Sequence, residues 1–134
     1  MKTSIVKYQG GLRTEAVHLK SGNKLLTDAP TDNHGKGEAF SPTDLLATSL
    51  GCCMLSIMGI VAMEHHFIFE ESSIETTKIM AANPRRVSEI IMEVQMPKIH
   101  FSEQQKRLLE HAALNCPVSK SLHPDIKQTV TFRY

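Results

Sequence analysis

The chain has 134 residues, which at roughly 150 residues per domain predicts a single domain over 1–134. Charged side chains make up 22% of the sequence, and 15 basic against 14 acidic residues leave a net charge of +1. This balance excludes disorder driven by charge, and it gives no electrostatic reason to expect a nucleic-acid partner. The composition is that of an ordinary globular domain, so the function has to come from particular residues.

The three cysteines, Cys52, Cys53 and Cys116, bear on the cellular compartment. An odd and low count argues against the disulfide framework of a secreted protein. Residues 1–7 also lack the apolar stretch of a signal peptide, so we expect a cytoplasmic protein whose thiols stay reduced. In that compartment a cysteine is either a small packing residue or a reactive group.

The first 40 residues predict three strands and a long loop. Residues 5–8, 14–19 and 24–27 are strand-like, with a turn at Gly10–Gly11 and a hairpin loop at Ser21–Asn23. Residues 28–40 hold few apolar positions and predict a loop of about a dozen residues, long enough to suspect a role at a site.

Ser41 to Asp44 predict the start of a helix that runs to about His65. Ser41 can cap it, Pro42 suits the first helical position, and Asp44 stands where a capping box needs its second acceptor. Residues 45–63 carry no charge, and their number is close to that of a membrane span. Polar and small residues interrupt the run, and no basic cluster flanks it. We therefore interpret this helix as the centre of a globular core or of a dimer, not as a membrane span.

The second half of the chain predicts three more strands and two helices. Residues 74–80 and 87–96 predict a strand pair with its turn at Asn83–Pro84. Ser102 to Gln105 predict a capping box that opens a helix, Pro117 begins a short one, and residues 130–134 predict a final strand. Because strands are grouped and do not alternate with helices, the sequence predicts an α+β fold with largely antiparallel sheet.

The long helix carries Cys52 and Cys53 on different faces. Cys53 shares a face with Leu46, Leu50 and Ile57, and Cys52 lies nearer to Ser49, Ser56 and Gly59. Both cysteines can be packing residues, as is common in apolar helices. A nucleophilic role requires a nearby cation, because burial raises the pKa of a thiol.

Cys116 follows the apolar stripe of the helix that begins near Ser102, and it directly precedes Pro117. We expect it to cap the short helix, where backbone N–H groups, the helix dipole and Lys120 would stabilise a thiolate. An unreactive cap residue is the alternative. Since both helices bury their cysteine-bearing faces, a thiol from each can meet in the core.

Arg13 follows the Gly10–Gly11 turn, which can carry it into a site, although most such arginines are solvated surface residues. His65 and His66, which are adjacent at the end of the long helix, raise the alternative of a zinc site together with the cysteines. One helix cannot present both histidines together with Cys52 and Cys53 to a single tetrahedral ion, so we expect no metal.

Four segments of the chain together resemble the OsmC/Ohr family of osmotically inducible and organic hydroperoxide resistance proteins. In chain order they are Gly10–Arg13, Phe40–Leu46, Leu50–Cys53 and Asn115–Ser119. The most characteristic part of the pattern is a proline that opens a central helix (Pro42), a cysteine eleven residues later (Cys53), and a late Cys-Pro-Val that begins at Cys116. The Ohr branch has a glutamate directly after the proline. This chain has Thr43 and then Asp44 there, so it is closer to the OsmC-like branches.

The resemblance implies antiparallel sheets packed around a long central apolar helix, in an intertwined homodimer with active sites at the subunit interface. It also implies a peroxidase that reduces organic hydroperoxides, with a dithiol reductant that resembles a lipoyl group and with no cofactor. By position, Cys53 corresponds to the peroxidatic cysteine, Cys116 to the resolving one, and Arg13 to the arginine that stabilises the thiolate. Asp44 is the candidate carboxylate for Arg13, or only the helix cap. Cys52 is a departure from the family pattern without an assigned role.

Two other classes of function stay open at this stage. One is a dimeric binding or stress protein whose cysteines only pack. The other is a cysteine hydrolase that uses Cys53 or Cys116 with one of the seven histidines, which requires a base within hydrogen-bond reach of the thiol. The surroundings of the two sulfurs and of Arg13 separate these possibilities.

Overall fold

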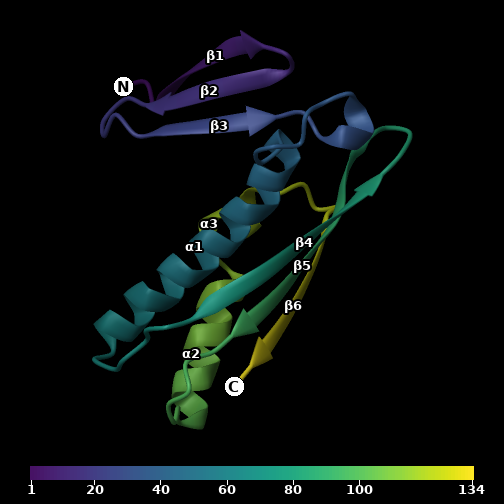
Figure 1. Ribbon diagram of the computed structural model, residues 1–134. Helices are drawn as coiled ribbons and strands as arrows, with labels where there is room; N and C mark the ends of the chain where they lie inside the picture. Colours follow the sequence, from purple (N-terminus) through teal and green to yellow (C-terminus); the bar gives the residue numbers. More distant parts are fainter. The chain divides into compact units, whose positions relative to one another are not determined.

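The computed structural model describes residues 1–134, which divide into two compact units, Met1–Leu46 and Ala47–Tyr134. The first unit is built on an antiparallel sheet in the order β1 (Ser4–Gly10), β2 (Arg13–His18) and β3 (Lys24–Asp28) (Figure 1). The hairpin between β2 and β3 closes through His18 and Gly22, whose backbone N–H groups donate to Asn23 and His18 carbonyls at 2.8 Å each. The predicted strands and the predicted Ser21–Asn23 loop are therefore confirmed.

The turn between β1 and β2 has an unusual backbone. Gly10, Gly11 and Leu12 all have positive φ, at 85°, 61° and 62°. Glycine adopts such angles without steric cost, and a pair of glycines lets the chain reverse within three residues. The turn delivers Arg13 to the first position of β2.

The long loop after β3 contains one short 3₁₀ helix, η1 (Thr31–Asn33), which the sequence did not predict. Gly35 packs so closely on this loop that a Cβ there would lie 1.7 Å from the Ala29 carbonyl oxygen. The loop is thus held in a tight conformation that only glycine permits at this position.

Helix α1 (Pro42–Glu64) begins at the predicted capping box. The Ser41 N–H donates to Asp44 Oδ2 at 2.9 Å, and the Asp44 N–H donates to Ser41 Oγ at 3.0 Å. This reciprocal pair satisfies two of the N–H groups that a helix start leaves without an intrahelical partner. The cap therefore fixes where the helix starts, and with it the position of the cysteines along its length.

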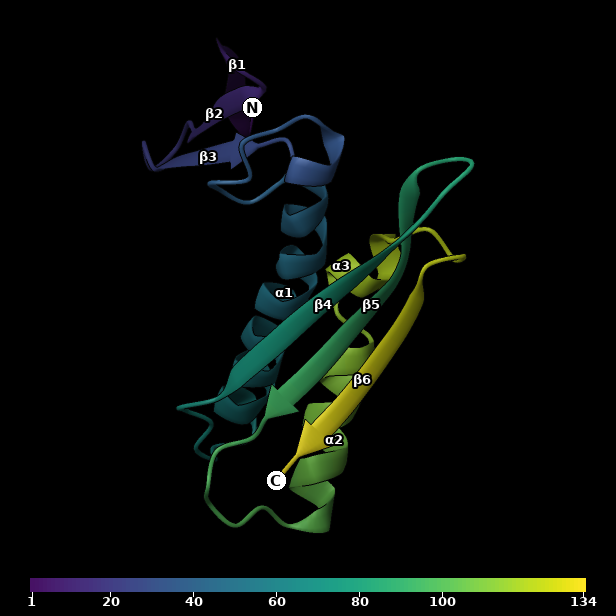
Figure 2. The ribbon, with the colours of Figure 1, turned by 45° about the vertical axis from the view of Figure 1, so that its right-hand side comes forward.

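The second unit is an α+β arrangement around the sheet β4 (Ser73–Ala81), β5 (Arg86–Gln95) and β6 (Lys127–Arg133), in that order. β4 pairs with β5 in antiparallel orientation, whereas β6 pairs with β5 in parallel. The connection from β5 to β6 contains α2 (Glu103–Leu114) and α3 (Pro117–Ser121) (Figure 2). The predicted capping box of α2 is confirmed: Ser102 Oγ accepts from the Gln105 N–H, and Gln105 accepts from the Ser102 N–H.

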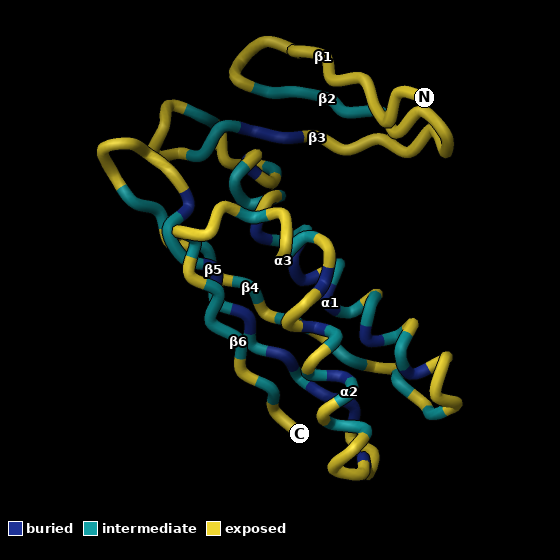
Figure 3. Tube along the Cα trace, turned by 180° about the vertical axis from the view of Figure 1, so that it is seen from behind, coloured by how far each residue is buried: buried dark blue, intermediate teal, exposed yellow.

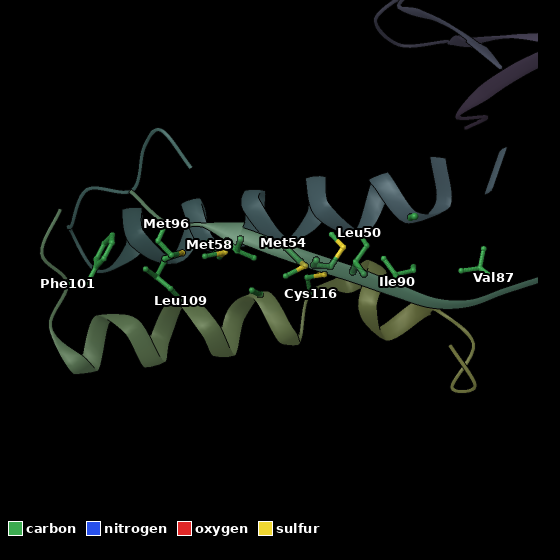
Figure 4. Close-up of a cluster of buried hydrophobic side chains, with 13 residues drawn as sticks. Leu50, Met54, Met58, Val87, Ile90, Met96, Phe101, Leu109 and Cys116 are labelled. Carbon is green, nitrogen blue, oxygen red and sulfur yellow. The ribbon is translucent and has the colours of Figure 1, made fainter. Parts of the chain in front are cut away.

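The core of this unit lies between the sheet and the two longer helices. Buried and less buried residues alternate along β5, as its sequence predicts (Figure 3). The side chains that fill the core share an exposure of 4% or less and come from α1, β5 and α2 with their flanks: Ala47, Leu50, Met54, Met58, Val87, Ile90, Met92, Val94, Met96, Phe101, Leu109, Ala113 and Cys116 (Figure 4).

Only one stripe of α1 enters this core, although residues 45–63 carry no charge. The helix is long and apolar enough to cross a membrane, and 33% of its most apolar window is buried. Its core-facing residues recur every three or four positions, as in Leu50, Met54 and Met58. The core helix of a globular protein meets the same length and composition test, which is the interpretation that the sequence favours.

Candidate functional site: a pair of thiols and an arginine cluster

Cys53 and Cys52 occupy different surroundings on α1. Cys53 is half-buried and packs against the core cluster, one turn after the buried Leu50, whereas Cys52 is exposed. Successive helical residues are separated by about 100° around the axis, so the two neighbouring thiols point in different directions. Of the two, only Cys53 is placed to meet a partner inside the second unit.

Cys116 sits at the break between α2 and α3, where it is fully buried. It is the N-cap residue of α3, and its Sγ accepts a hydrogen bond from the Ser119 N–H at 3.5 Å. Pro117, at the first position of α3, is compatible with a helix start because that position has no intrahelical donor to lose. In Figure 4 the Cys116 side chain lies beside Leu50 and Met54 of α1.

The structure brings Cys53 and Cys116 together. Burial raises the pKa of the Cys116 thiol, and the Cys53 side chain raises this pKa further, by hydrogen bonding and by charge. Backbone N–H groups of Ser119 and Val118 act in the opposite direction. All three cysteines are free thiols. The second unit thus holds a reduced pair of neighbouring thiols, one half-buried and one buried.

This result corrects one expectation from the sequence. The cap position was expected to stabilise a Cys116 thiolate, and the cap hydrogen bond does form. The larger effect, however, is desolvation, because Cys116 is sealed inside the core and water cannot solvate its charged form. At neutral pH Cys116 is therefore a protonated thiol.

In the first unit, Arg13 is clamped by carboxylates. Its Nε donates to Asp28 Oδ1 at 2.7 Å and its Nη2 to Asp28 Oδ2 at 2.8 Å, which is a bidentate ion pair. A second contact joins Nη2 to Glu38 Oε2 at 3.3 Å. Asp28 is completely buried and also accepts from the Glu38 N–H at 3.1 Å. The hydrogen bond from Arg13 is the main reason that the pKa of Asp28 is lowered.

Asp28 and Glu38 are the residues that the sequence interpretation missed. The candidate carboxylate was Asp44, which the structure places in the capping box of α1. The signal for Asp28 lay in the hairpin itself. With Val17 opposite Lys24 across the predicted turn, an antiparallel register places Arg13 directly opposite Asp28.

The described residues contain no group of three or more His, Cys, Asp or Glu side chains placed to hold a metal ion. Besides burial, Cys53 and backbone N–H groups affect the pKa of the Cys116 thiol. Two neighbouring free thiols such as Cys53 and Cys116 can form a disulfide when they are oxidised, which is chemistry that this arrangement allows.

The fold and the thiol pair define a class, an α+β protein with a reduced pair of cysteines carried by two helices. The chain matches the family model of OsmC-like proteins over residues 35–131, and it belongs to that family. No curated protein matches the chain.

Solved structures agree with this assignment. A protein of Psychrobacter arcticus 273-4, named for osmotic stress induction and a detoxification response, is 52% identical with a TM-score of 0.95, over 99% of this chain and 96% of that one. An organic hydroperoxide resistance protein OsmC from Legionella pneumophila is 20% identical with a TM-score of 0.77, and the match covers 100% of this chain and 98% of that one. A third structure is an organic hydroperoxide resistance protein from Vibrio cholerae O1 biovar eltor, with captopril bound in one of its active sites. It is 18% identical with a TM-score of 0.75, and the match covers 98% of this chain and 92% of that one. The two more distant likenesses show the fold.

Proposed function

We propose that this protein is a thiol peroxidase that reduces organic hydroperoxides. The observation that carries the proposal is the contact between the half-buried Cys53 and the buried Cys116. The names of the Legionella and Vibrio proteins, which refer to organic hydroperoxide resistance, support the class of substrate.

In the first step the Cys53 thiolate attacks the terminal oxygen of the hydroperoxide. The O–O bond breaks, the alcohol leaves with a proton, and Cys53 becomes a sulfenic acid. In the second step the Cys116 sulfur attacks the Cys53 sulfur and the S–O bond breaks. The hydroxyl leaves as water with the Cys116 proton, so that one disulfide forms. An external dithiol then returns both cysteines to thiols by exchange.

The different surroundings of the two thiols support this order of events. Burial keeps Cys116 protonated at neutral pH, which makes it a poor first nucleophile, because the thiolate is the reactive form. A protonated Cys116 still serves the second step, since its proton completes the water that leaves. Of the two neighbouring thiols, the half-buried Cys53 has the greater access to solvent.

The proposal also assigns roles around Cys53. Leu50 and Ile57 lie one turn to either side of it on α1, and apolar neighbours favour an alkyl group over bare hydrogen peroxide. Arg13, held by Asp28 and Glu38, is the cation that we propose to stabilise the thiolate. Asp44 acts at the start of α1.

The proposed partners are a second copy of the chain, the hydroperoxide, and a dithiol reductant such as a lipoyl group. The proposed location of the protein is the cytoplasm. Support for the second copy comes from the uncharged face of α1 that stays outside the core, where Ile60 is 47% and Met63 is 77% exposed. Apolar surface of this kind is stabilised by association. Light scattering at micromolar concentration should give a dimer, and a stable monomer of 15.0 kDa would contradict this part of the proposal.

Peptide mass mapping tests the chemistry. One equivalent of tert-butyl hydroperoxide should link Cys53 to Cys116 and leave Cys52 free. Cys53→Ser should abolish peroxide consumption, and Cys116→Ser should consume peroxide once and then over-oxidise at Cys53. Cys52→Ser is the matched control and should behave like the natural protein.

Each opposite result has a defined meaning. A disulfide through Cys52, or normal turnover of Cys53→Ser, would show that the nucleophile is assigned wrongly. If no thiol is oxidised, the chain is better described as a stress-related binding protein, in keeping with the name of the Psychrobacter relative.

A further inference from the structure

Gln128 of β6 is a polar residue on a side of the sheet where apolar residues are expected. It lies on the same side of the chain as Ile126, Val130 and Phe132, which pack against the core cluster. In the β5–β6 pairing it is opposite the fully buried Ile90. Burying an amide costs free energy unless its polar atoms find partners. The position of Gln128 therefore calls for a function.

Both ends of the Gln128 amide are used, and both contact Ser119. The Ser119 hydroxyl donates to Gln128 Oε1 at 2.6 Å, and Gln128 Nε2 donates to the Ser119 carbonyl oxygen at 3.2 Å. The Ser119 hydroxyl also lies 3.4 Å from the Leu114 carbonyl oxygen, at the end of α2. This two-point clamp ties the first turn of α3 to the end of α2 and to the sheet.

Ser119 in turn contacts the proposed resolving thiol. Its backbone N–H is the donor to Cys116 Sγ, at 3.5 Å. Helix α3 has only five residues, and a helix this short has little stability of its own. The position of the Ser119 N–H, and with it the orientation of Cys116 Sγ toward Cys53, therefore depends on the clamp that holds the turn in place.

We propose that Gln128 is a positioning residue for disulfide formation: through Ser119 it holds the Cys116 sulfur in line with Cys53. This inference rests on the proposed peroxidase function and assigns Gln128 to its second step alone. In that step the S–S bond forms as the S–O bond of the Cys53 sulfenic acid breaks and water leaves. The first step, oxidation of Cys53 by the hydroperoxide, does not involve the clamp.

Rapid-mixing kinetics with tert-butyl hydroperoxide separate the two steps, because the sulfenic acid and the disulfide can be trapped at successive times. Gln128→Ala should slow disulfide formation about tenfold, the effect of losing one or two hydrogen bonds, and should leave the oxidation of Cys53 within about twofold. Excess peroxide should then convert part of Cys53 to sulfinic acid. Gln128→Glu keeps the acceptor for the Ser119 hydroxyl but loses the amide donor. Its rate of disulfide formation should therefore lie between those of the natural protein and Gln128→Ala. Thr131→Ala, an exposed position on the same strand, is the control.

Diamide, which oxidises neighbouring thiols directly, keeps the inference testable without peroxide chemistry. If peroxide oxidises no thiol, the proposed function fails, and the rate of the diamide-driven Cys53–Cys116 disulfide still decides the role of Gln128. Should Gln128→Ala not fold, Ser119→Ala removes the shared hydroxyl and takes its place in both assays. Equal disulfide rates in variant and natural protein would overturn the inference, and so would an equal slowing of both steps, since that is the behaviour of a purely structural residue.

Discussion

Leu50 offers the clearest test of how α1 is held in the second unit. It lies in the middle of the buried stripe and is 1% exposed. Leu50→Ala removes three carbon atoms, which at about 0.8 kcal/mol per buried methylene costs about 2.4 kcal/mol in transfer free energy. The surrounding core relaxes only in part, and the remaining cavity raises the expected loss in free energy of unfolding to about 3–5 kcal/mol.

Urea denaturation of the reduced protein measures this loss. With a slope of about 2 kcal/mol per molar urea, a loss of about 3–5 kcal/mol lowers the midpoint by about 1.5–2.5 M. Protein concentration must be the same in all samples, because association stabilises the folded state by mass action. Leu114→Ala is the matched control: this residue is 48% exposed at the end of α2, and it should lose about 1 kcal/mol or less. Equal drops in midpoint for the two variants would refute the assignment of the α1 stripe as core.

Three further predictions concern other parts of the structure. Because Arg13 lowers the pKa of Asp28, their ion pair contributes fully above the ordinary aspartate pKa of about 3.9 and is lost as the pH falls through the lowered value. Asp28→Asn should thus lower the urea midpoint at pH 7, and the difference from the natural protein should shrink below about pH 4. Gly51→Val should cost about 1–3 kcal/mol in thermal melts, because a Cβ there already lies 3.1 Å from the Met92 methyl carbon. If Arg13 stabilises the thiolate, Arg13→Ala should slow oxidation of Cys53 by tert-butyl hydroperoxide at least about tenfold, and an unchanged rate would remove Arg13 from the mechanism.

Local signals in the sequence predicted most of the helix and strand positions. Ser41, Asp44 and Ser102 mark helix starts because a capping box depends only on residues three positions apart. The alternation along β5 is equally local, since side-chain direction in a strand has a period of two. The same reasoning placed Cys116 correctly at the cap of α3.

Features that depend on residues far apart in the sequence were harder to predict from it. The parallel partner of β5 is set by a crossover through two helices, and no local pattern distinguishes it from an antiparallel neighbour. The direction of the pKa shift of Cys116 was predicted wrongly for a similar reason, because burial by side chains far away in sequence outweighs the adjacent cap. The partner of Arg13 could have been predicted, although it was not. The register of the β2–β3 hairpin places Asp28 directly opposite Arg13.

The parallel pairing of β5 with β6 has a consequence for the order of folding. It joins Glu89 to Lys127, 38 positions later, whereas the neighbouring β4–β5 hairpin joins Ala81 to Arg86. Contacts between distant residues form late, because a long segment must lose its conformational freedom before they do. Cys116 lies inside that segment, and Gln128, which anchors its turn, lies on the strand that closes it. During synthesis, therefore, Cys116 should reach its place beside Cys53 only after the chain has been made as far as β6, because the contacts that hold its turn do not exist before then.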